Sequence, residues 1–437
     1  MAPRLSVIGT GYLGATHAAC MAELGFEVIG VDVDPAKVEL LRSGRVPFYE
    51  PGLDEVLARN IEAGRLSFTT SFEEAGAFAD VHFICVGTPQ QAGSHAADMT
   101  QVFGSVAALT PHLKAGDLVV GKSTVPVGTA DAIAAKLAAV EGVEVAWNPE
   151  FLREGFAVED TLHPDRLVVG VRSERSERIL REVYAPLLAE GIPFLVTDFP
   201  TAELVKVAAN SFLATKISFI NAMAEVCEAA GADVTKLAEA IGYDPRIGNR
   251  FLAAGLGFGG GCLPKDIRAF MARAGEIGAE EALTFLREVD QINLRRRAHT
   301  VDLARAAVGG TFDGKKVVVL GAAFKPDSDD VRDSPSLAVA ATIQNEGGDV
   351  TVHDPKALAN AARIYPKLGY EQDLMTALTG AELVLHLTEW REYRELDPAQ
   401  AAAAASSLHV IDARNTLDPA QWRAAGWAYR ALGRPTA

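Results

Sequence analysis

The sequence predicts an α/β protein of two doubly wound parallel-sheet domains joined by a long central helix. Three observations support this. Strand-like apolar runs alternate with helical stretches from residue 4 onward, which is typical of a parallel sheet with crossover helices. A second strand–helix–strand unit begins near Lys315 and repeats the order of the first. Between them, residues 201–230 form a largely apolar stretch without Gly or Pro.

Length and charge set the broad class. A chain of 437 residues is too long for one hydrophobic core, so two or three domains are expected. The formal net charge of -16 argues against a general binder of nucleic acids or anionic membranes. No apolar run is long enough to span a bilayer, and the chain enters a strand at once, which leaves no room for a signal peptide. We therefore expect a cytoplasmic protein.

The first domain begins with a strand–helix–strand unit. Residues 4–34 read as a strand, a Gly-rich turn, an amphipathic helix that stops at Gly25, and a second apolar strand. Further strands are expected within four apolar runs, at residues 79–87, 117–124, 143–149 and 166–171.

The central stretch predicts one helix of about 30 residues, about 45 Å long. Apolar residues cover most of its faces, so we expect it to join two domains and to pack against a second subunit in a homodimer. The second sheet is expected from strands within 315–355, 381–388 and 409–414. The predicted domains are 1–200, 201–300 and 301–437.

A dinucleotide site is predicted by the pattern Gly9-x-Gly11-x-x-Gly14, which follows a strand and opens a helix. In such Rossmann-like units the first glycine allows a tight turn, the second admits a pyrophosphate, and the third lets the helix pack on the strand. Asp32 ends the next strand, where an acid binds the ribose 2′-hydroxyl and repels a 2′-phosphate. NAD is therefore favoured over NADP. Asp34 competes for this role, but it precedes a proline and is typical of a turn acid.

Two threonines also follow apolar strands. Ligands of such sheets bind outside the carboxyl ends of the strands, so Thr88 and Thr124 are candidates to reach the cofactor or the reacting centre. On spacing alone, ordinary turn chemistry is the better explanation.

Four cysteines are present, and one differs from the rest. Cys20, Cys85 and Cys227 have apolar neighbours and are expected to be buried, whereas Cys262 lies among loop residues in "GFGGGCLPKD". No cluster has metal-ligand spacing, so no metal site is expected.

Cys262 precedes a helix that begins near Pro264. A helix N-terminus lowers the pKa of a thiol and favours the thiolate, and Asp266, one turn further on, is placed to handle protons. Lys206 and Asn210 share one face of the central helix. The lysine suits two roles equally, as a cation that stabilises an oxyanion or as an interface lysine that extends to solvent.

A dinucleotide site with one activated cysteine predicts oxidation of an alcohol to an acid. Hydride transfer to NAD makes an aldehyde, and the thiolate adds to it as a thiohemiacetal. A second hydride transfer gives a thioester, which water hydrolyses.

Longer segments resemble the nucleotide-sugar 6-dehydrogenases, the UDP-glucose/GDP-mannose dehydrogenase family. The resemblance spans nearly the whole chain and is carried by "GTGYLG", "VPFYEPGLDEVL", "VGTP", "KSTVPVGT", "NPEFLREG", "AELVKVAANSFLATKISFINAM", "RIGNRFLAAGLGFGGGCLPKD", "GAAFKPDSDDVRDSP" and "TEWREY". It implies oxidation of C6 of a nucleotide sugar to a carboxylate, with two NAD and one water. The segments look most like the UDP-glucose branch, which forms UDP-glucuronate.

The resemblance also implies roles for single residues. It makes Cys262 the nucleophile, Lys206 and Asn210 stabilisers of oxyanions, and Asp266 with Thr124 a pair that moves protons through an ordered water. Glu150 would deliver the hydrolytic water, and Glu154 would lie by the nicotinamide. Further cofactor contacts implied are Tyr12, Leu13, Lys37, Thr88, Lys265 and Arg332. Substrate contacts implied are Glu150, Phe151, Leu152, Arg153, Glu154, Lys206, Asn210, Phe251, Leu252, Ala253, Ala254, Gly255, Gly259 and Lys325, with Arg414 a weaker candidate and Arg246 reaching the substrate of a partner subunit.

Alternatives remain at two levels. Relatives that act on GDP-mannose or UDP-N-acetylhexosamines share the cysteine, lysine and glycine motifs, and a non-enzymatic NAD-binding sensor would share the fold. Two departures from the family pattern stand out: Gly261, where relatives often carry Tyr or Ser, and the loop "QQAGSHAADM". Gly261 is expected to widen the site slightly.

Overall fold

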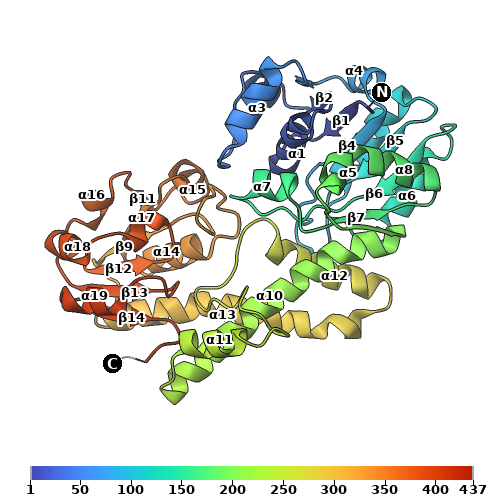
Figure 1. The fold of residues 1–437 in the computed structure, drawn as a ribbon. Coiled ribbons are helices and arrows are strands. Elements are labelled where there is room, and N and C mark those ends of the chain that lie inside the picture. The colour runs from blue at the N-terminus through green and yellow to red at the C-terminus, as the bar shows by residue number, and fades with distance from the viewer. Residues whose placement is uncertain (1, 436–437) are drawn as a thin grey trace. The chain divides into compact units, whose positions relative to one another are not determined.

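The computed structural model describes residues 2–435. The chain divides into two compact units, Met1–Ala209 with Arg268–Gly278 and Asn210–Ile267 with Ala279–Ala437. It passes from one unit to the other three times, inside α10 (Phe199–Ala230), inside α12 (Leu263–Glu276) and again after Gly278, which follows α12 (Figure 1). Each unit contains one sheet, so the predicted pair of α/β sheets with a long central helix is confirmed.

The first unit has an eight-stranded sheet in the order β3-β2-β1-β4-β5-β6-β7-β8. The order reverses between β1 and β4, which marks the crevice where doubly wound sheets bind ligands. Strands β3 and β8 form the two edges and lie outside the predicted set. The bounds are β1 Leu5–Ile8, β2 Val28–Val31, β3 Leu66–Thr69, β4 Val81–Ile84, β5 Leu118–Gly121, β6 Glu144–Trp147, β7 Leu167–Gly170 and β8 Phe194–Thr197.

One pair of neighbouring strands in this predominantly parallel sheet is antiparallel. Strand β7 pairs antiparallel with β6 at Trp147 and Gly170, while β7 and β8 are parallel to each other. A parallel β6–β7 pair would need the chain to cross back over the sheet. Instead, residues 148–166 contain only the six-residue helix α7 (Ala157–Leu162), and β7 starts at the edge where β6 ends. The 150–155 loop therefore stays at the carboxyl ends of the parallel strands.

Helices cover both faces of the sheet. On one face, α1, α2, α3, α8 and α9 form a hydrophobic cluster with Leu5 and Val7 of β1. On the other face, α4, α5, α6 and the start of α10 pack with Ile8 and Ile84. The bounds are α1 Tyr12–Glu23, α2 Pro35–Arg42, α3 Leu53–Glu62, α4 Phe72–Phe78, α5 Thr100–Leu109, η1 Thr110–His112, α6 Thr129–Leu137, α8 Glu174–Val183 and α9 Ala185–Ala189.

The long helix has the predicted length and position. The sequence predicts about 30 residues, and α10 runs for 32. Within the second unit it leaves Phe212, Phe219 and Val226 exposed, at a spacing of seven residues. Residues seven apart lie on the same side of a helix, so these three form an apolar stripe. The second unit also contains α11 Val234–Gly242, η2 Glu280–Leu283 and α13 Thr284–Ala307.

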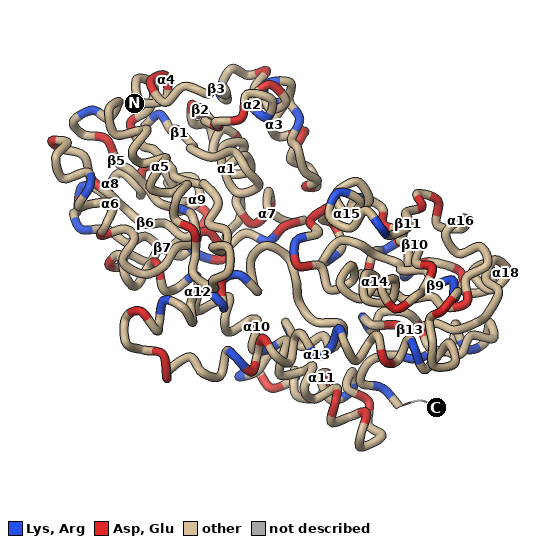
Figure 2. The backbone as a smooth tube through the Cα atoms, turned by 180° about the vertical axis from the view of Figure 1, so that it is seen from behind, with Lys and Arg blue, Asp and Glu red and all other residues tan. Residues whose placement is uncertain are grey.

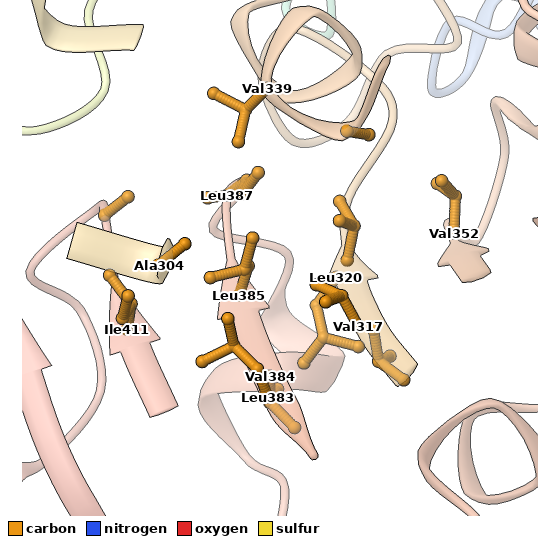
Figure 3. Packing of buried hydrophobic residues seen from close by; sticks show 14 of the residues in the cluster. Ala304, Val317, Leu320, Val339, Val352, Leu383, Val384, Leu385, Leu387 and Ile411 are labelled. Carbon is orange, nitrogen blue, oxygen red and sulfur yellow. The ribbon is translucent and has the colours of Figure 1, made fainter. Parts of the chain in front are cut away.

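The second sheet has six strands, all parallel, in the order β11-β10-β9-β12-β13-β14. Its core is one cluster in which Val317, Leu385 and Ile411 of the strands pack with Ala304 of α13 and Val339 of α14 (Figure 3). The bounds are β9 Lys316–Leu320, α14 Pro335–Asn345, β10 Asp349–His353, α15 Leu358–Ile364, β11 Gly369–Tyr370, α16 Leu374–Leu378, β12 Leu383–His386, α17 Arg391–Arg394, α18 Pro398–Ala404, β13 His409–Asp412, α19 Pro419–Ala424 and β14 Ala428–Ala431.

The two sheets share a local device, which supports the weak internal repeat. In the first, Asp32 after β2 accepts a hydrogen bond from the N–H of Thr10 in the loop after β1. In the second, Asp354 after β10 accepts from the N–H groups of Ala322 and Ala323 in the loop after β9. Trp390 Nε1 also donates to Asp354, which is fully buried, so this second acid is engaged internally.

Acidic and basic residues are interspersed along the backbone of each unit (Figure 2). Across residues 2–435, no helix is both long enough and apolar enough to cross a membrane.

Candidate active site

The glycine loop of the first unit has the geometry that a dinucleotide needs. Gly9 has φ +87°, and a Cβ on it would lie 2.6 Å from the Val86 side chain. A Cβ on Gly14 would lie 1.8 Å from the carbonyl oxygen of Gly9, so helix α1 can approach the strand only with glycine there. A Cβ on Gly11 would meet no atom within 4 Å, which leaves open space at the N-terminus of α1. A diphosphate fits this arrangement.

Asp32 is held in the position expected of a ribose ligand. Its Oδ2 accepts from the N–H of Thr10 (3.0 Å), the hydroxyl of Thr10 (2.9 Å) and Lys37 Nζ (2.8 Å), and its Oδ1 accepts from the N–H of Asp34 (3.1 Å). Burial raises the pKa of Asp32, but these hydrogen bonds, led by that from Lys37, outweigh burial and lower it overall. The carboxylate is therefore ionised at neutral pH. Asp34 caps α2 through the N–H of Ala36 (2.9 Å), as expected of the turn acid.

Thr88 and Thr124, predicted from separate strands, are brought together. The hydroxyl of Thr88 donates to the carbonyl oxygen of Thr124 at 2.8 Å, and Thr88 is buried. This bond joins the loops after β4 and β5, in keeping with the turn interpretation of Thr88.

Glu150 lies in a buried polar network that includes a residue absent from the predicted site. Lys122 Nζ contacts Glu150 Oε2 at 2.9 Å and donates to Asn148 Oδ1 at 3.1 Å, and Tyr184 also donates to Asn148 Oδ1. Glu150 Oε1 accepts from the N–H groups of Phe151 (2.7 Å) and Leu152 (3.1 Å). The Lys122–Glu150 contact favours the charged form of both residues, and the two N–H groups further favour the charged glutamate.

The pKa values of this pair diverge. Burial by itself raises the pKa of Glu150, but Lys122 and the Phe151 N–H lower it below its usual value. Burial by itself lowers the pKa of Lys122, but the charge of Glu150 raises it above its usual value. Glu150 is consequently an anion, and the N–H groups of the two residues that follow it hold its carboxylate in one orientation.

The remaining predicted residues of the 150–154 loop, and two predicted residues of neighbouring helices, have different contacts. Lys206 Nζ lies 5.5 Å from the centre of the Phe151 ring, and the Arg166 guanidinium lies 3.8 Å from the same ring. Arg153 forms a two-point ion pair with Asp160, at 2.9 and 2.6 Å. Glu154 is buried, and Leu13 packs against the cluster on the α1 face.

Cys262 begins α12 as the sequence predicts. Its carbonyl oxygen accepts from the N–H of Asp266 at 2.9 Å, which is the first hydrogen bond of the helix. Cys262 is exposed, whereas Cys20, Cys85 and Cys227 are buried. Burial raises the pKa of Cys20 and of Cys85 to about 12, so both are unreactive thiols at neutral pH.

Asp266, Asn210 and Lys265 form a compact cluster one turn into α12. Asn210 Nδ2 donates to Asp266 Oδ2 at 2.7 Å, and Lys265 Nζ contacts Asp266 Oδ1 at 2.5 Å. Asn210 and Asp266 are buried, with 7% and 2% of their surfaces exposed. The structure therefore unites three residues that the sequence could relate only by resemblance.

The segment from Phe251 to Gly261 is held through backbone groups between Ala254 and Gly260. Asn221 of α10 accepts from the N–H of Gly255 (2.8 Å), and Arg296 of α13 donates to its carbonyl oxygen (3.3 Å). Asn293 accepts from the N–H of Phe258 (2.8 Å) and donates to its carbonyl oxygen (2.9 Å), as a neighbouring strand would. The loop that leads to the cysteine is thus rigidly supported, although it lies outside regular secondary structure.

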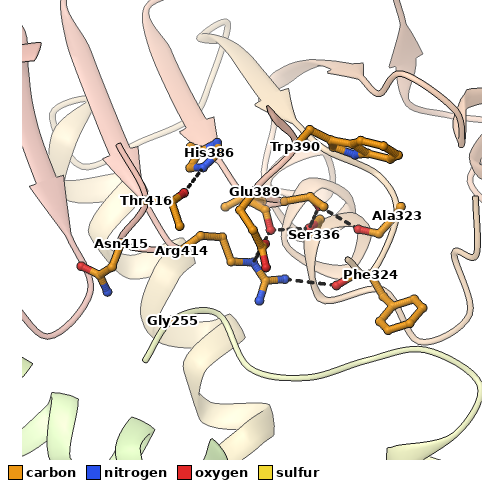
Figure 4. Close-up of polar contacts among 12 residues, drawn as sticks. Gly255, Ala323, Phe324, Ser336, His386, Glu389, Trp390, Arg414, Asn415 and Thr416 are labelled. Atoms are coloured by element: carbon orange, nitrogen blue, oxygen red, sulfur yellow. Dashed lines mark hydrogen bonds and ion pairs between the residues drawn. The ribbon is translucent and has the colours of Figure 1, made fainter. Parts of the chain in front are cut away.

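Arg414 supports the same segment and connects it to two other loops (Figure 4). Its guanidinium donates to the carbonyl oxygens of Gly257 (3.0 Å), Leu387 (2.6 Å) and Phe324 (3.4 Å), and it contacts Glu389 at 3.3 Å. Its donors are directed at backbone carbonyls, which is the geometry of a structural brace.

Arg332 lies directly over the cysteine segment. Its carbonyl oxygen accepts from the N–H of Gly260 (2.9 Å), and a Cβ on Gly261 would lie 2.3 Å from its guanidinium carbon. Asp330 holds the guanidinium at 2.9 and 2.7 Å. The space left by Gly261 is thus filled by Arg332, so in this structure the expected widening at Gly261 is taken up by an arginine.

Two other predicted residues of the second unit differ in exposure, since Lys325 is half-buried and Arg246 is exposed. Lys325 Nζ lies 5.5 Å from the centre of the Phe324 ring. The Arg246 side chain is 87% exposed and contacts Asp244 at 2.6 Å. The Arg246 side chain therefore extends into solvent and contacts little of its own chain.

Sequence reasoning missed three residues that support the site: Glu50, Lys122 and Asn293. Each acts on residues more than 25 positions away, so spacing along the chain contains no sign of the contact. A buried charge within a strand motif, as in "VGKSTVP", is the one usable signal, because burial of an unpaired charge is costly.

Comparisons with known proteins match this chain to one family over nearly its full length. Three models of the UDP-glucose/GDP-mannose dehydrogenase family match: the NAD binding domain over residues 3–188, the central domain over 200–295 and the UDP binding domain over 318–419. A UDP-glucose 6-dehydrogenase of Rhizobium meliloti is 39% identical, over 99% of this chain and 100% of the relative. One of Bacillus subtilis is 40% identical, over 98% of this chain and 97% of the relative.

Solved structures give the same result. A UDP-glucose dehydrogenase from the archaeon Pyrobaculum islandicum superposes with a TM-score of 0.90 and 40% identity, covering 99% of this chain and 98% of that one. A UDP-D-ManNAc dehydrogenase from Pyrococcus horikoshii has a TM-score of 0.87 and 25% identity, covering 99% and 100%. Together with the glycine loop and the cysteine at the start of α12, these matches show that the chain belongs to the UDP-glucose/GDP-mannose dehydrogenase family.

Proposed function

We propose that this chain is an NAD-dependent UDP-glucose 6-dehydrogenase, which oxidises C6 of UDP-glucose to the carboxylate of UDP-glucuronate. The observation that carries the proposal is Cys262, an exposed thiol at the start of α12, one turn from the buried Asn210–Asp266 pair. Full-length identity of about 40% to relatives named for this reaction supports the choice of substrate.

In this proposal Cys262 keeps the sugar bound between two oxidations. NAD, when bound, accepts a hydride in each. The C6 alcohol loses a hydride and its hydroxyl proton to become an aldehyde, and Cys262 Sγ adds to that carbon to form a thiohemiacetal. Loss of a second hydride and proton gives a thioester. Water then adds to the thioester carbon and the C–S bond breaks, which releases the carboxylate and one proton and restores the thiol.

The neighbouring polar residues stabilise charge and move protons. Lys206 and Asn210 stabilise the oxyanions of the intermediates. Asp266, with Thr124, transfers protons through an ordered water. Lys265 lies beside Asp266, with Nζ at 2.5 Å from Oδ1. Glu150 directs the hydrolytic water, and its lowered pKa supports an anion that orients water rather than a reservoir of protons.

The cofactor and substrate are bound by separate sets of residues. The open face of Gly11 and the ionised Asp32 support NAD, with contacts from Tyr12, Leu13, Lys37, Thr88, Glu154, Lys265 and Arg332. The 150–154 backbone, residues 251–255, Gly259 and Lys325 bind the sugar nucleotide. The dense backbone support of the 251–261 segment favours this role, since a rigid loop loses little entropy on binding.

A homodimer completes the proposal. The exposed apolar stripe of Phe212, Phe219 and Val226 on α10 supports a helix-to-helix contact with a second copy. Arg246, which extends to solvent, would reach the substrate of the partner subunit. The division into 1–200, 201–300 and 301–437 follows the three family models closely and assigns NAD binding, dimerisation and UDP-sugar binding in that order. A cytoplasmic location stays a prediction.

A panel of nucleotide sugars tests the substrate. Purified protein is given NAD with UDP-glucose, GDP-mannose, UDP-N-acetylglucosamine or UDP-N-acetylmannosamine, and NADH is followed by absorbance. We expect UDP-glucose to be preferred and to yield two NADH per molecule consumed. A preference for GDP-mannose or an N-acetyl sugar would overturn the assignment. Binding of NAD and UDP-glucose without any NADH would favour a sensor.

A further inference from the structure

Glu50 occupies a position between two parts of the first unit that the proposed function uses separately. It lies in the loop between α2 and α3 and is 5% exposed. Its Oε2 accepts from the N–H of Gly155 at 2.6 Å and from the hydroxyl of Tyr12, and its Oε1 accepts from the N–H of Ala157 at 2.7 Å. The Tyr12 oxygen also accepts from the N–H of Gly155 at 2.9 Å.

Both sides of this contact belong to functional segments. Tyr12 is the first residue of α1, directly after the glycine loop. Gly155 follows the 150–154 loop, which contains Glu150, and Gly155 itself has φ +80°, a conformation that L side chains rarely adopt. One buried carboxylate thus connects the N-terminus of the cofactor helix to the end of the loop that contains the water-directing glutamate.

The segment that carries Glu50 fixes Tyr12 from two directions. The Phe48 ring lies 4.8 Å from the Tyr12 ring, and Glu50 binds the Tyr12 hydroxyl. The Tyr12 hydroxyl is engaged by Glu50 and Gly155, so a cofactor contact of Tyr12 would be made by its backbone or ring. A charged acceptor makes stronger bonds to N–H and O–H donors than a neutral amide does.

We propose that Glu50 is a positioning residue that locks Tyr12 and the 150–155 loop into one arrangement, and that the rate of thioester hydrolysis depends on it. The inference rests on the proposed function, because the roles of Tyr12 and Glu150 come from it. In the hydrolysis step, water adds to the thioester carbon and the C–S bond breaks. One proton of the water goes to the sulfur, which is restored as the thiol, and the other is released with the carboxylate. Glu150 orients that water, so a loosened loop slows this step more than the two oxidations.

The test uses Glu50→Gln in the full-length protein, with rapid mixing of enzyme, NAD and UDP-glucose. The amide keeps the shape of the carboxylate but turns one acceptor into a donor that faces an N–H group. We expect a burst of about two NADH per active site followed by a steady rate at least tenfold below wild type, because the thioester accumulates. KM for UDP-glucose should change less than kcat.

Glu23→Gln is the matched control. Glu23 of α1 binds Arg59 and Asn60 of α3 in the same unit, away from the 150–155 loop. The Glu23→Gln variant should have a lower melting temperature than wild type and should show no burst of NADH. A second variant, Tyr12→Phe, removes only the hydroxyl contacts and should show a smaller burst than Glu50→Gln. In the double variant Tyr12→Phe/Glu50→Gln, the loss of kcat, expressed as a free energy, should be smaller than the sum of the losses in the two single variants.

Three results would overturn the proposal. The first is wild-type kcat without a burst in Glu50→Gln. The second is a rate that falls only in proportion to folded protein, as for a purely structural residue. The third, if Glu50→Gln does not fold, is a Tyr12→Phe enzyme with wild-type kinetics. A wild-type enzyme that makes no NADH from UDP-glucose would contradict the proposed function instead, so the two failures are distinguishable.

Discussion

Cys262 and Cys227 have opposite surroundings although both belong to the second unit. Cys262 is exposed at the start of α12, and Cys227 of α10 is 1% exposed in a small cluster that α10 forms with Val234 of α11 and with Leu252 and Ala254. Burial raises the pKa of Cys227. Only the first thiol is therefore accessible to a substrate carbon.

Cys262→Ser should bind NAD and UDP-glucose normally and lose turnover. A serine hydroxyl lacks the acidity and nucleophilicity of a thiol, so kcat should fall by about 1,000-fold or more. Binding is measured by calorimetry and turnover by NADH absorbance. Cys227→Ala serves as control and should reduce the melting temperature while preserving kcat. Near-normal turnover of Cys262→Ser would exclude the thioester step.

The Lys122–Glu150 pair predicts a pH-dependent contribution to stability. Glu150 has a lowered pKa in the folded chain, so its contribution is present above its ordinary pKa of 4.5 and is lost as pH falls through the lowered value. Lys122 has a raised pKa, so its contribution is present below 10.5 and is lost only as pH rises through the raised value. The pair is therefore fully stabilising at neutral pH.

Lys122→Met should cost about 3 kcal/mol of unfolding free energy at pH 7, because it leaves Glu150 charged and largely buried. The double variant Lys122→Met/Glu150→Gln should recover most of this loss and show a weaker decline on acidification below pH 4.5. Urea unfolding at pH 7 and pH 4 measures both effects. Equal stabilities of the single and double variants would contradict the ion-pair argument.

At the scale of elements, the helices show where sequence patterns succeed and fail. Helix α1 was expected to be amphipathic, which is wrong: residues 14–22 are all buried. Besides the sheet, helices α3 and α7 pack against α1. Neither contact is visible in the local sequence of α1, because both partners come from other parts of the chain. Helix α10 matched its prediction because its length and apolar content are local properties.

In the 251–261 segment, the backbone at Gly257 passes so close to Asn293 that only glycine fits, which allows a stability prediction. Gly257 has φ +96°, and a Cβ there would lie 2.3 Å from Asn293 Oδ1. Gly257→Ala should therefore lose about 3 kcal/mol of unfolding free energy, through strain and the broken contact with Asn293, and should raise KM for UDP-glucose.

Gly191→Ala is the control for this loop. Gly191 has φ +85°, and its Cβ would meet no atom within 4 Å, so it should lose about 1 kcal/mol through strain alone and keep its KM. Denaturant unfolding and steady-state kinetics separate the two effects. Equal losses in both variants would show that the close approach to Asn293 contributes nothing.

At the scale of the whole molecule, the proposed dimer predicts that defective chains can complement each other. Arg246→Ala and Cys262→Ser should each be nearly inactive alone. In a mixed dimer, the chain with intact Cys262 receives Arg246 from its partner, so one site of two is complete. Random pairing makes half of the dimers mixed, so co-expression should restore about a quarter of wild-type activity. No recovery would exclude action of Arg246 across subunits.

The sequence by itself determined the features that depend on neighbours along the chain. These are the glycine loop and its acid, the long helix, the cysteine at a helix start, and the alternation of strands and helices that identifies the fold class. Each follows from backbone conformations and periodicities within about 30 residues.

The tertiary structure alone decided how distant segments meet. It reversed β7, buried α1 on both sides, placed Arg332 over Gly261, and joined Glu50 to Gly155, Lys122 to Glu150, and Asn293 to Phe258. These contacts depend on which loops the sheet edges bring together, and a buried charge or amide is stable only where the fold supplies its partner. That partner can be any residue of the right chemistry, so its position in the sequence gives no indication of the contact.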